Sequence, residues 1–250
     1  MTQKKDNEKV TEANVAEAVK IATQGAALLA MAGPKAAGAY IAYEGASTLT
    51  GRSIGPFIKR RFDDAVQRVY QMLGRDPHTE EAANAPEAEL DAFALVFRSL
   101  LESPDEDVVP AIEALAASYI AQGRKADTFM RRTARMLVDL NAEDLRCVYE
   151  TLLQAKRHAE EGPVLAIVAT WDKEDTVIVR PYRTGHSGKH TYGVQNGKRA
   201  VEILAGSQIG RHHDVHGGVA LLLDNQTIER LVEILSHAPA AMTPAEPPAP

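Results

Sequence analysis

The sequence predicts a mainly α protein: an N-terminal helical hairpin, an antiparallel helical bundle, and a small α+β domain at the carboxyl end. Three observations lead to this prediction. Apolar residues recur at helical spacing from residue 56 to 161, and the pattern changes to alternation after Gly162-Pro163. The 250 residues are also 45% hydrophobic and 25% charged, which is the composition of a folded globular chain rather than a disordered or collagen-like one.

Residues 12–50 are predicted to form a hairpin of two helices rich in small residues. Ile21 to Pro34 is an uncharged run of 14 residues, shorter than the roughly 20 that a membrane-spanning helix needs. Two interpretations stay open: a hairpin packed in a soluble core, and a segment that contacts a bilayer. The membrane-contact candidates are Leu28, Leu29, Met31, Tyr40 and Ile41. Because acidic residues precede this stretch, we do not expect a secretion signal.

Five amphipathic helices with short connections are predicted between residues 56 and 161, which implies antiparallel neighbours. Proline, glycine and capping residues give their expected limits: Gly55-Pro56 to Gly74, Pro86 to Leu101, Ser103 to Gly123, Asp127 to Leu140, and Asn141 to Glu161. In the third helix, Ser103 and Glu106 form a predicted capping box. Pro110 instead favours a start near Val108, or a bend there.

Charge is distributed unevenly along the predicted bundle. Basic residues cluster in the first and fourth helices, while residues 76–107 carry ten acidic side chains and one arginine, Arg98. We expect these basic and acidic faces to meet within the bundle or to lie in solvent. The alternative is a site for phosphate or anionic lipid, since aromatic residues do not alternate with the cations as they do in single-strand binders. The anion-binding candidates are Lys59, Arg60, Arg61, Arg131, Arg132 and Arg135.

The α+β domain is predicted to span residues 162–237. Val164 to Thr170 and Thr176 to Arg180 alternate around a charged turn, which indicates a β-hairpin. Val219 to Leu223 is expected to be a buried strand, and Asp224 is expected to cap the closing helix.

Two parts of this region are less regular. After Asn196-Gly197, either a second hairpin or a short helix over Arg199 to Leu204 is consistent with the sequence. Residues 238–250 are rich in proline, and we expect them to form an extended or disordered tail.

Histidines are concentrated in two predicted loops of the α+β domain. They are His186, His190, His212, His213 and His216, five of the eight in the chain. Imidazole and carboxylate groups are natural ligands of zinc, manganese or iron, so converging loops would form an open metal site. The competing interpretation is that these are solvated loop histidines. No cofactor is therefore predicted, and a divalent metal is the alternative. The single Cys147 cannot form an internal disulfide, which fits a reducing compartment.

The order of features along the amino-terminal two thirds is also informative. A Gly/Ala-rich segment precedes a basic helix, a helix with an acidic end, and a helix that begins on a polar cap. The segments that carry this order are Gly51 to Arg61, Leu100 to Asp107, and Met136 to Leu145. In this order, residues 10–160 resemble the Abi-alpha family of bacterial phage abortive-infection proteins. The resemblance implies a helical protein of phage defence, and it supplies no active-site residues.

We therefore expect a non-enzymatic helical interaction protein, acting as a phage-defence effector or regulator, that is cytoplasmic or peripheral at the inner membrane. A protein partner ranks first, a membrane surface second and nucleic acid after both, because the net charge of −6 argues against a histone-like polyanion binder. Homo-oligomerisation stays open. The first alternative is a metal-dependent hydrolase that uses the loop histidines. The second alternative is a nucleic-acid binder that uses the basic helix 124–135.

Overall fold

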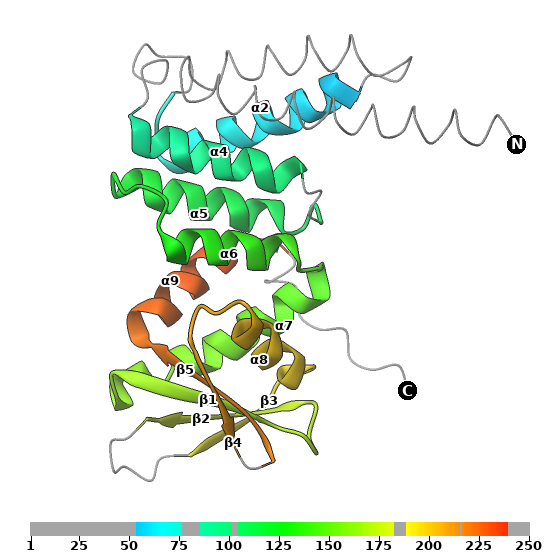
Figure 1. Ribbon diagram of the computed structural model, residues 1–250, viewed down its shortest axis with the longest axis vertical. Coiled ribbons are helices and arrows are strands. Elements are labelled where there is room, and N and C mark those ends of the chain that lie inside the picture. The colour runs from blue at the N-terminus through cyan, green and yellow to red at the C-terminus, as the bar shows by residue number, and fades with distance from the viewer. Residues whose placement is uncertain (1–53, 77–85, 102–104, 183–188, 216, 240–250) are drawn as a thin grey trace, which may run out of the picture. The chain divides into compact units, whose positions relative to one another are not determined.

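The computed structural model describes residues 54–76, 86–101, 105–182, 189–215 and 217–239. It confirms a mostly helical protein with a carboxyl-terminal antiparallel sheet (Figure 1). In chain order, the elements are α2 (Ile54–Met72), α4 (Glu87–Leu101), α5 (Val109–Ala121), α6 (Thr128–Val138), α7 (Ala142–Lys156), η1 (Ala159–Glu161), β1 (Val164–Thr170), β2 (Thr176–Pro181), β3 (His190–Gly193), α8 (Gly197–Gly206), β4 (Arg211–Val215), β5 (Gly218–Asp224) and α9 (Asn225–Leu235). The predicted hairpin at 12–50, with its five membrane-contact candidates, and the tail from residue 240 lie outside the described residues. None of the described helices is both long enough and apolar enough to cross a membrane.

The chain divides into two compact units. The helical unit contains α2, α4 and the end of α5 from Ala116 onward. The α+β unit contains the start of α5, up to Leu115, together with α6 to α9 and the sheet. We expected α6 and α7 in a helical domain ending at residue 161, but they share a unit with the sheet. The reason is that α7 packs against α8 and α9, so its apolar stripe belongs to the core of the α+β unit.

In the helical unit, α2 packs against α4. The rings of Tyr70 and Phe93 lie 5.4 Å apart at this contact. The predicted helix end at Gly74 is confirmed: its φ of 65° is in the left-handed region that favours glycine, and the Arg75 N–H donates back to the Tyr70 carbonyl. The buried Glu89 carboxylate accepts hydrogen bonds from the Tyr70 hydroxyl and from Arg75, the latter at 3.3 Å. These donors compensate the burial of this charged group.

Helix starts in the α+β unit follow most of the predicted caps. The side chains of Asn141 and Asp224 accept backbone N–H groups at the starts of α7 and α9, as expected. The start near Val108 that Pro110 favours is confirmed, because α5 begins at Val109, whereas Ser103 of the predicted capping box lies outside the described residues. Pro110 then lies in the first turn, where its missing N–H costs no hydrogen bond.

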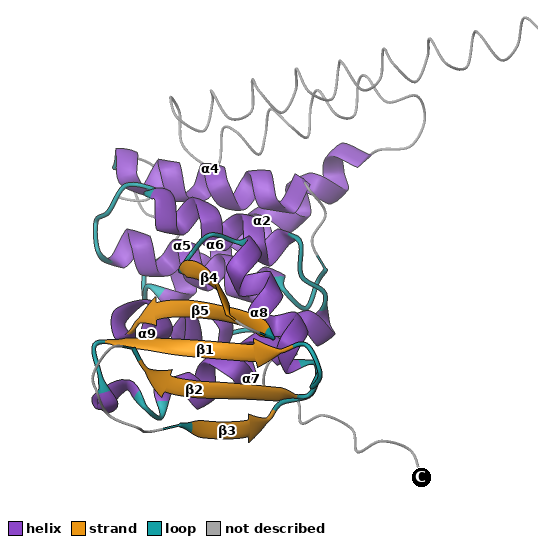
Figure 2. Ribbon diagram, turned by 60° about the horizontal axis from the view of Figure 1, so that its bottom comes forward, coloured by secondary structure: helices purple, strands orange, loops and turns teal. Residues whose placement is uncertain are grey.

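The sheet has strand order β3-β2-β1-β5-β4, and all neighbours are antiparallel (Figure 2). The predicted β1–β2 hairpin and the buried β5 strand are confirmed. After Asn196 the chain forms α8, so the helix interpretation is right and the second hairpin is wrong. Gly197 is packed tightly there, because a Cβ at this position would lie 2.8 Å from Val177 Cγ1.

Side chains of the sheet alternate between two faces. Helices α7, α8 and α9 pack against one, which we call the helix face (Figures 1 and 2). The other, the second face, carries a separate apolar cluster of Ala166, Val168, Ala220 and Leu222, with Val164, Ile178 and Tyr182 packed against it. Strand register therefore determines the face on which each histidine of the sheet lies.

Candidate metal centre

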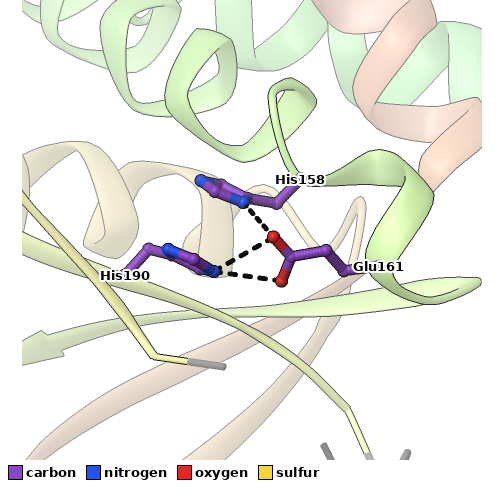
Figure 3. A group of neighbouring side chains, drawn as sticks. All are labelled: His158, Glu161 and His190. Carbon is purple, nitrogen blue, oxygen red and sulfur yellow. Dashed lines mark hydrogen bonds and ion pairs between the residues drawn. The ribbon is translucent and has the colours of Figure 1, made fainter. Parts of the chain in front are cut away.

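Two imidazoles and one carboxylate converge where α7 leads into the sheet. They belong to His158, Glu161 and His190 (Figure 3). His158 and Glu161 lie at the two ends of the 3₁₀ turn η1, and side chains three residues apart in such a turn lie on the same side. The Glu161 N–H donates to the His158 carbonyl at 3.0 Å, which closes the turn. Local backbone geometry therefore brings the first two groups together.

Asn225, the first residue of α9, anchors this turn. Its side-chain amide donates to the carbonyls of Ala159 and Gly162, the latter at 3.0 Å. Its backbone N–H donates to the Pro163 carbonyl at 3.3 Å. Because α9 also packs against α7 and β5, these bonds hold the η1 turn in place beside the sheet.

The edge strand β3 supplies the third donor and a tyrosine. His190 pairs with Val179 and Tyr192 pairs with Val177, and both valines are fully buried on the helix face. Residues directly opposite each other in an antiparallel pair share a face, so His190 and Tyr192 also lie on the helix face. There the His190 ring stacks on His158, with centroids 3.8 Å apart and planes 16° apart, and the Tyr192 hydroxyl hydrogen-bonds to His158 Nε2.

The ligand atoms of the three side chains all lie within 4.8 Å of one another. His158 Nδ1 is 2.5 Å from Glu161 Oε1, and His190 Nε2 is 3.0 and 3.1 Å from the two carboxylate oxygens. Hydrogen bonds from His158, and secondarily from His190, lower the pKa of Glu161, so its carboxylate is charged at neutral pH. The His158 side chain is 12% exposed, whereas those of Glu161 and His190 are 34% and 35% exposed. The cluster is thus buried on the His158 side and open to solvent on the side of Glu161 and His190.

This donor set fits a divalent transition-metal ion. Two imidazole nitrogens and a carboxylate oxygen are typical zinc ligands in sites that keep a fourth position open. Ligand atoms around tetrahedral zinc lie roughly 3.4 Å apart, so His158 Nδ1 and Glu161 Oε1 must separate by about 1 Å to admit the ion. The two stacked rings must also splay, because each nitrogen lone pair lies in the plane of its ring. Tyr192 provides the outer-shell hydrogen bond that metal-ligating histidines commonly have.

The structure separates the histidines that the sequence grouped. His190 lies in β3 while His212 and His213 lie in β4, four interstrand steps away at the other edge of the sheet, or about 19 Å. His212 and His213 are strand residues rather than loop residues, and as neighbours in a strand they point to opposite faces. The His213 ring lies 6.4 Å from that of Tyr182, on the second face. His190 therefore shares no site with His212 or His213, while His186 and His216 lie outside the described residues.

Sequence reasoning missed His158, Glu161 and Tyr192. Two signals for them were present in the chain. His158 and Glu161 are three residues apart at the end of a predicted helix, a spacing that places both on one side of a turn. His190 and Tyr192 are two residues apart in a segment that reads as a strand, a spacing that places both on one face.

The predicted anion-binding residues lie on two helices. Those on α2 are Lys59, Arg60 and Arg61, and those on α6 are Arg131, Arg132 and Arg135. Arg60 is exposed and lies 3.9 Å from Asp64, and the side chain of Lys59 is outside the described part of the chain. Arg132 donates to the Gln208 carbonyl at 2.7 Å, which ties α6 to the loop after α8. Arg131 and Arg135 are exposed on α6.

Cys147 is a free cysteine buried in α7. Burial raises the pKa of its thiol to about 11. A neutral, inaccessible thiol is neither a nucleophile nor a metal ligand near neutral pH.

No family model, curated protein or solved structure matches this chain.

Proposed function

We propose that this protein binds a divalent transition-metal ion, with zinc preferred, through His158, Glu161 and His190. The observation that carries the proposal is the convergence of three ligand atoms within 4.8 Å, contributed by the η1 turn and by the edge strand β3. Imidazole nitrogens favour zinc over magnesium or calcium, which prefer oxygen ligands.

A bound ion would cross-link the turn after α7 to the edge strand β3 of the sheet. Because His190 lies 29 residues beyond Glu161 in the chain, the ion would join segments that separate on unfolding. A ligand that binds the folded state alone stabilises it in proportion to the logarithm of its concentration over its Kd. Zinc should therefore raise the unfolding temperature of the protein.

Calorimetry and thermal unfolding of tag-free protein, with and without zinc, test this proposal. We expect one zinc ion per chain and a higher unfolding temperature in its presence. His190→Ala should weaken binding by at least about 100-fold, more than the 10- to 100-fold loss typical of outer-shell changes. The matched control is His212→Ala, a histidine at the helix-face register of the other edge strand, which should bind as the wild type does. Absence of zinc binding by the wild-type protein, or equal loss in both variants, would refute the proposal.

A metal-dependent hydrolase is the second candidate. Three protein ligands leave one coordination position for water, and about a third of the Glu161 and His190 side chains is open to solvent. A zinc ion in such a site supplies an activated water as nucleophile. Assays of activated carboxylic and phosphate esters with the zinc-loaded protein address this candidate. Hydrolysis that disappears in His190→Ala supports it, and hydrolysis that persists in that variant argues against it.

For the whole chain we propose the role that the sequence indicates: a non-enzymatic, cytoplasmic or peripheral interaction protein of bacterial phage defence, in which the metal is structural. The mostly helical architecture supports it, as do the exposed Arg131 and Arg135 on α6, which are available to an anionic partner. Flotation with anionic liposomes, comparing the full chain with one that lacks residues 12–50, tests the membrane version. Failure of both to float would leave contact with a protein partner.

A further inference from the structure

We infer that Tyr192 is a positioning residue of the metal centre, whose hydroxyl donates to His158 Nε2 without metal and accepts from it when Nδ1 binds the ion. This inference rests on the proposed metal site. It assigns a specific task to a side chain that is not itself a ligand.

In the metal-free cluster, both ring nitrogens of His158 have partners. Glu161 Oε1 lies 2.5 Å from Nδ1, and the Tyr192 hydroxyl is bonded to Nε2. A glutamate carboxylate at neutral pH has no proton to donate, so Glu161 can only accept the hydrogen bond from the ring. The ring proton therefore lies on Nδ1. In the neutral ring, Nε2 then carries a lone pair, and the Tyr192 hydroxyl donates to it.

Metal binding requires the opposite tautomer. A metal-ligating Nδ1 must present its lone pair, so the proton on Nδ1 leaves to solvent and Nε2 takes one up. The ring remains neutral, and His158 releases no net proton. The new N–H at Nε2 then needs an acceptor. A tyrosine hydroxyl can serve in both states because it has a rotatable O–H and oxygen lone pairs, whereas a carboxylate or a carbonyl could only accept.

The strand fixes this hydroxyl in place. Tyr192 pairs with the fully buried Val177, and its ring lies 5.7 Å from the His158 ring at 40°. Tyr192→Phe should keep this ring contact and remove only the hydroxyl. Tyr182→Phe is a matched control, because Tyr182 packs against the second face, beside His213 rather than His158.

Zinc affinity, measured by competition with a chromophoric chelator, is the first test. We expect Tyr192→Phe to bind zinc about 10- to 100-fold more weakly than wild type, and Tyr182→Phe to bind with unchanged affinity. The Co²⁺ absorption spectrum should stay the same in the Tyr192→Phe variant, since the three ligands are retained. A loss of affinity accompanied by a changed Co²⁺ spectrum would assign Tyr192 to the ligand set and overturn the inference.

The second test needs no variant. Long-range ¹H–¹⁵N correlation spectra of ¹⁵N-labelled wild-type protein report which nitrogen of His158 carries the proton. We expect Nδ1–H without metal and Nε2–H with zinc, the change of tautomer on which the two roles of the Tyr192 hydroxyl depend. A ring protonated on Nε2 without metal overturns the inference, as does normal zinc affinity in Tyr192→Phe, and both outcomes leave the metal site intact. If the wild-type protein binds no zinc, the proposed function fails first, and the inference falls with it.

Discussion

The two edges of the sheet both carry histidines, but they place them in different surroundings. At one edge, β3 brings His190 against His158 and Glu161 of the η1 turn. At the other edge, β4 directs His212 and His213 to opposite faces of the sheet. The convergence of imidazole and carboxylate groups therefore depends on a turn anchored opposite the edge strand and not on the number of histidines nearby.

The edges also differ in how their geometry is fixed. On the β4 side, backbones approach closely: a Cβ at Gly210, the residue before β4, would lie 2.6 Å from the carbonyl oxygen of Leu222 in β5. On the β3 side, a Cβ at Gly193 would meet only the Asp175 carbonyl oxygen, at 4.0 Å. Close backbone packing thus defines the β4–β5 side, whereas side-chain hydrogen bonds secure β3 against η1.

The largest difference in stability should be between two Gly→Ala variants, one at each edge of the sheet. We expect Gly210→Ala to destabilise the protein by about 3 kcal/mol, because a rigid backbone carbonyl of β5 occupies the space that the methyl group needs. Gly193→Ala should change stability by less than about 1 kcal/mol, since its site has room. Denaturant unfolding of both variants provides the measurement. Similar destabilisation by the two substitutions would contradict the steric difference between the edges.

The anchor of the η1 turn should give the next largest effect. Asn225→Ala removes two side-chain hydrogen bonds to the Ala159 and Gly162 carbonyls, and we expect a loss of about 1–3 kcal/mol in unfolding free energy. Zinc affinity should fall as well, because His158 and Glu161 would no longer be held towards β3. Gln226→Ala, an exposed neighbour on the same helix, is the control and should leave both quantities unchanged. If Asn225→Ala lowered stability but not zinc affinity, the anchor would not position the ligands.

The helices and the central strands could be predicted from sequence because their signals are local. Apolar spacing identified α7 and α9, and Asn141 and Asp224 identified their caps. The Asn196-Gly197 pair misled in part: Asn196 does adopt the left-handed conformation of a turn, with φ 54°, but Gly197 packs under Val177 and starts a helix. Tertiary packing, which no local pattern contains, decided between the two interpretations.

The candidate site could not be predicted for a related reason. The predicted domain boundary fell between Glu161 and Gly162, so His158 and Glu161 were assigned to one domain and His190 to another. The ligands meet only because α7 packs beneath the sheet and β3 pairs with β2 at its edge. The concentration of histidines suggested a metal site in this region as a hypothesis, but strand order determines which histidines are neighbours.

The smallest expected effect is a pH dependence of the unfolding free energy, which the Glu161 carboxylate should cause at the β3 edge and not at the β4 edge. With a chelator present, hydrogen bonds from His158 and His190 lower the pKa of Glu161 in the folded protein, whereas the unfolded chain keeps the ordinary value of about 4.3. As pH falls, the unfolded state takes up this proton first, so the stabilisation by the carboxylate is present above about pH 5 and is lost as pH falls through the folded pKa.

The stability difference between wild type and Glu161→Gln should therefore be largest above about pH 5 and should shrink towards pH 3. Because a third of the side chain is exposed, salt should reduce this difference further. Urea unfolding at each pH measures this difference. The difference between wild type and His213→Gln, on the β4 edge, should show no such trend. If the difference for Glu161→Gln stayed constant down to about pH 3, the charge of Glu161 would not stabilise the β3 edge.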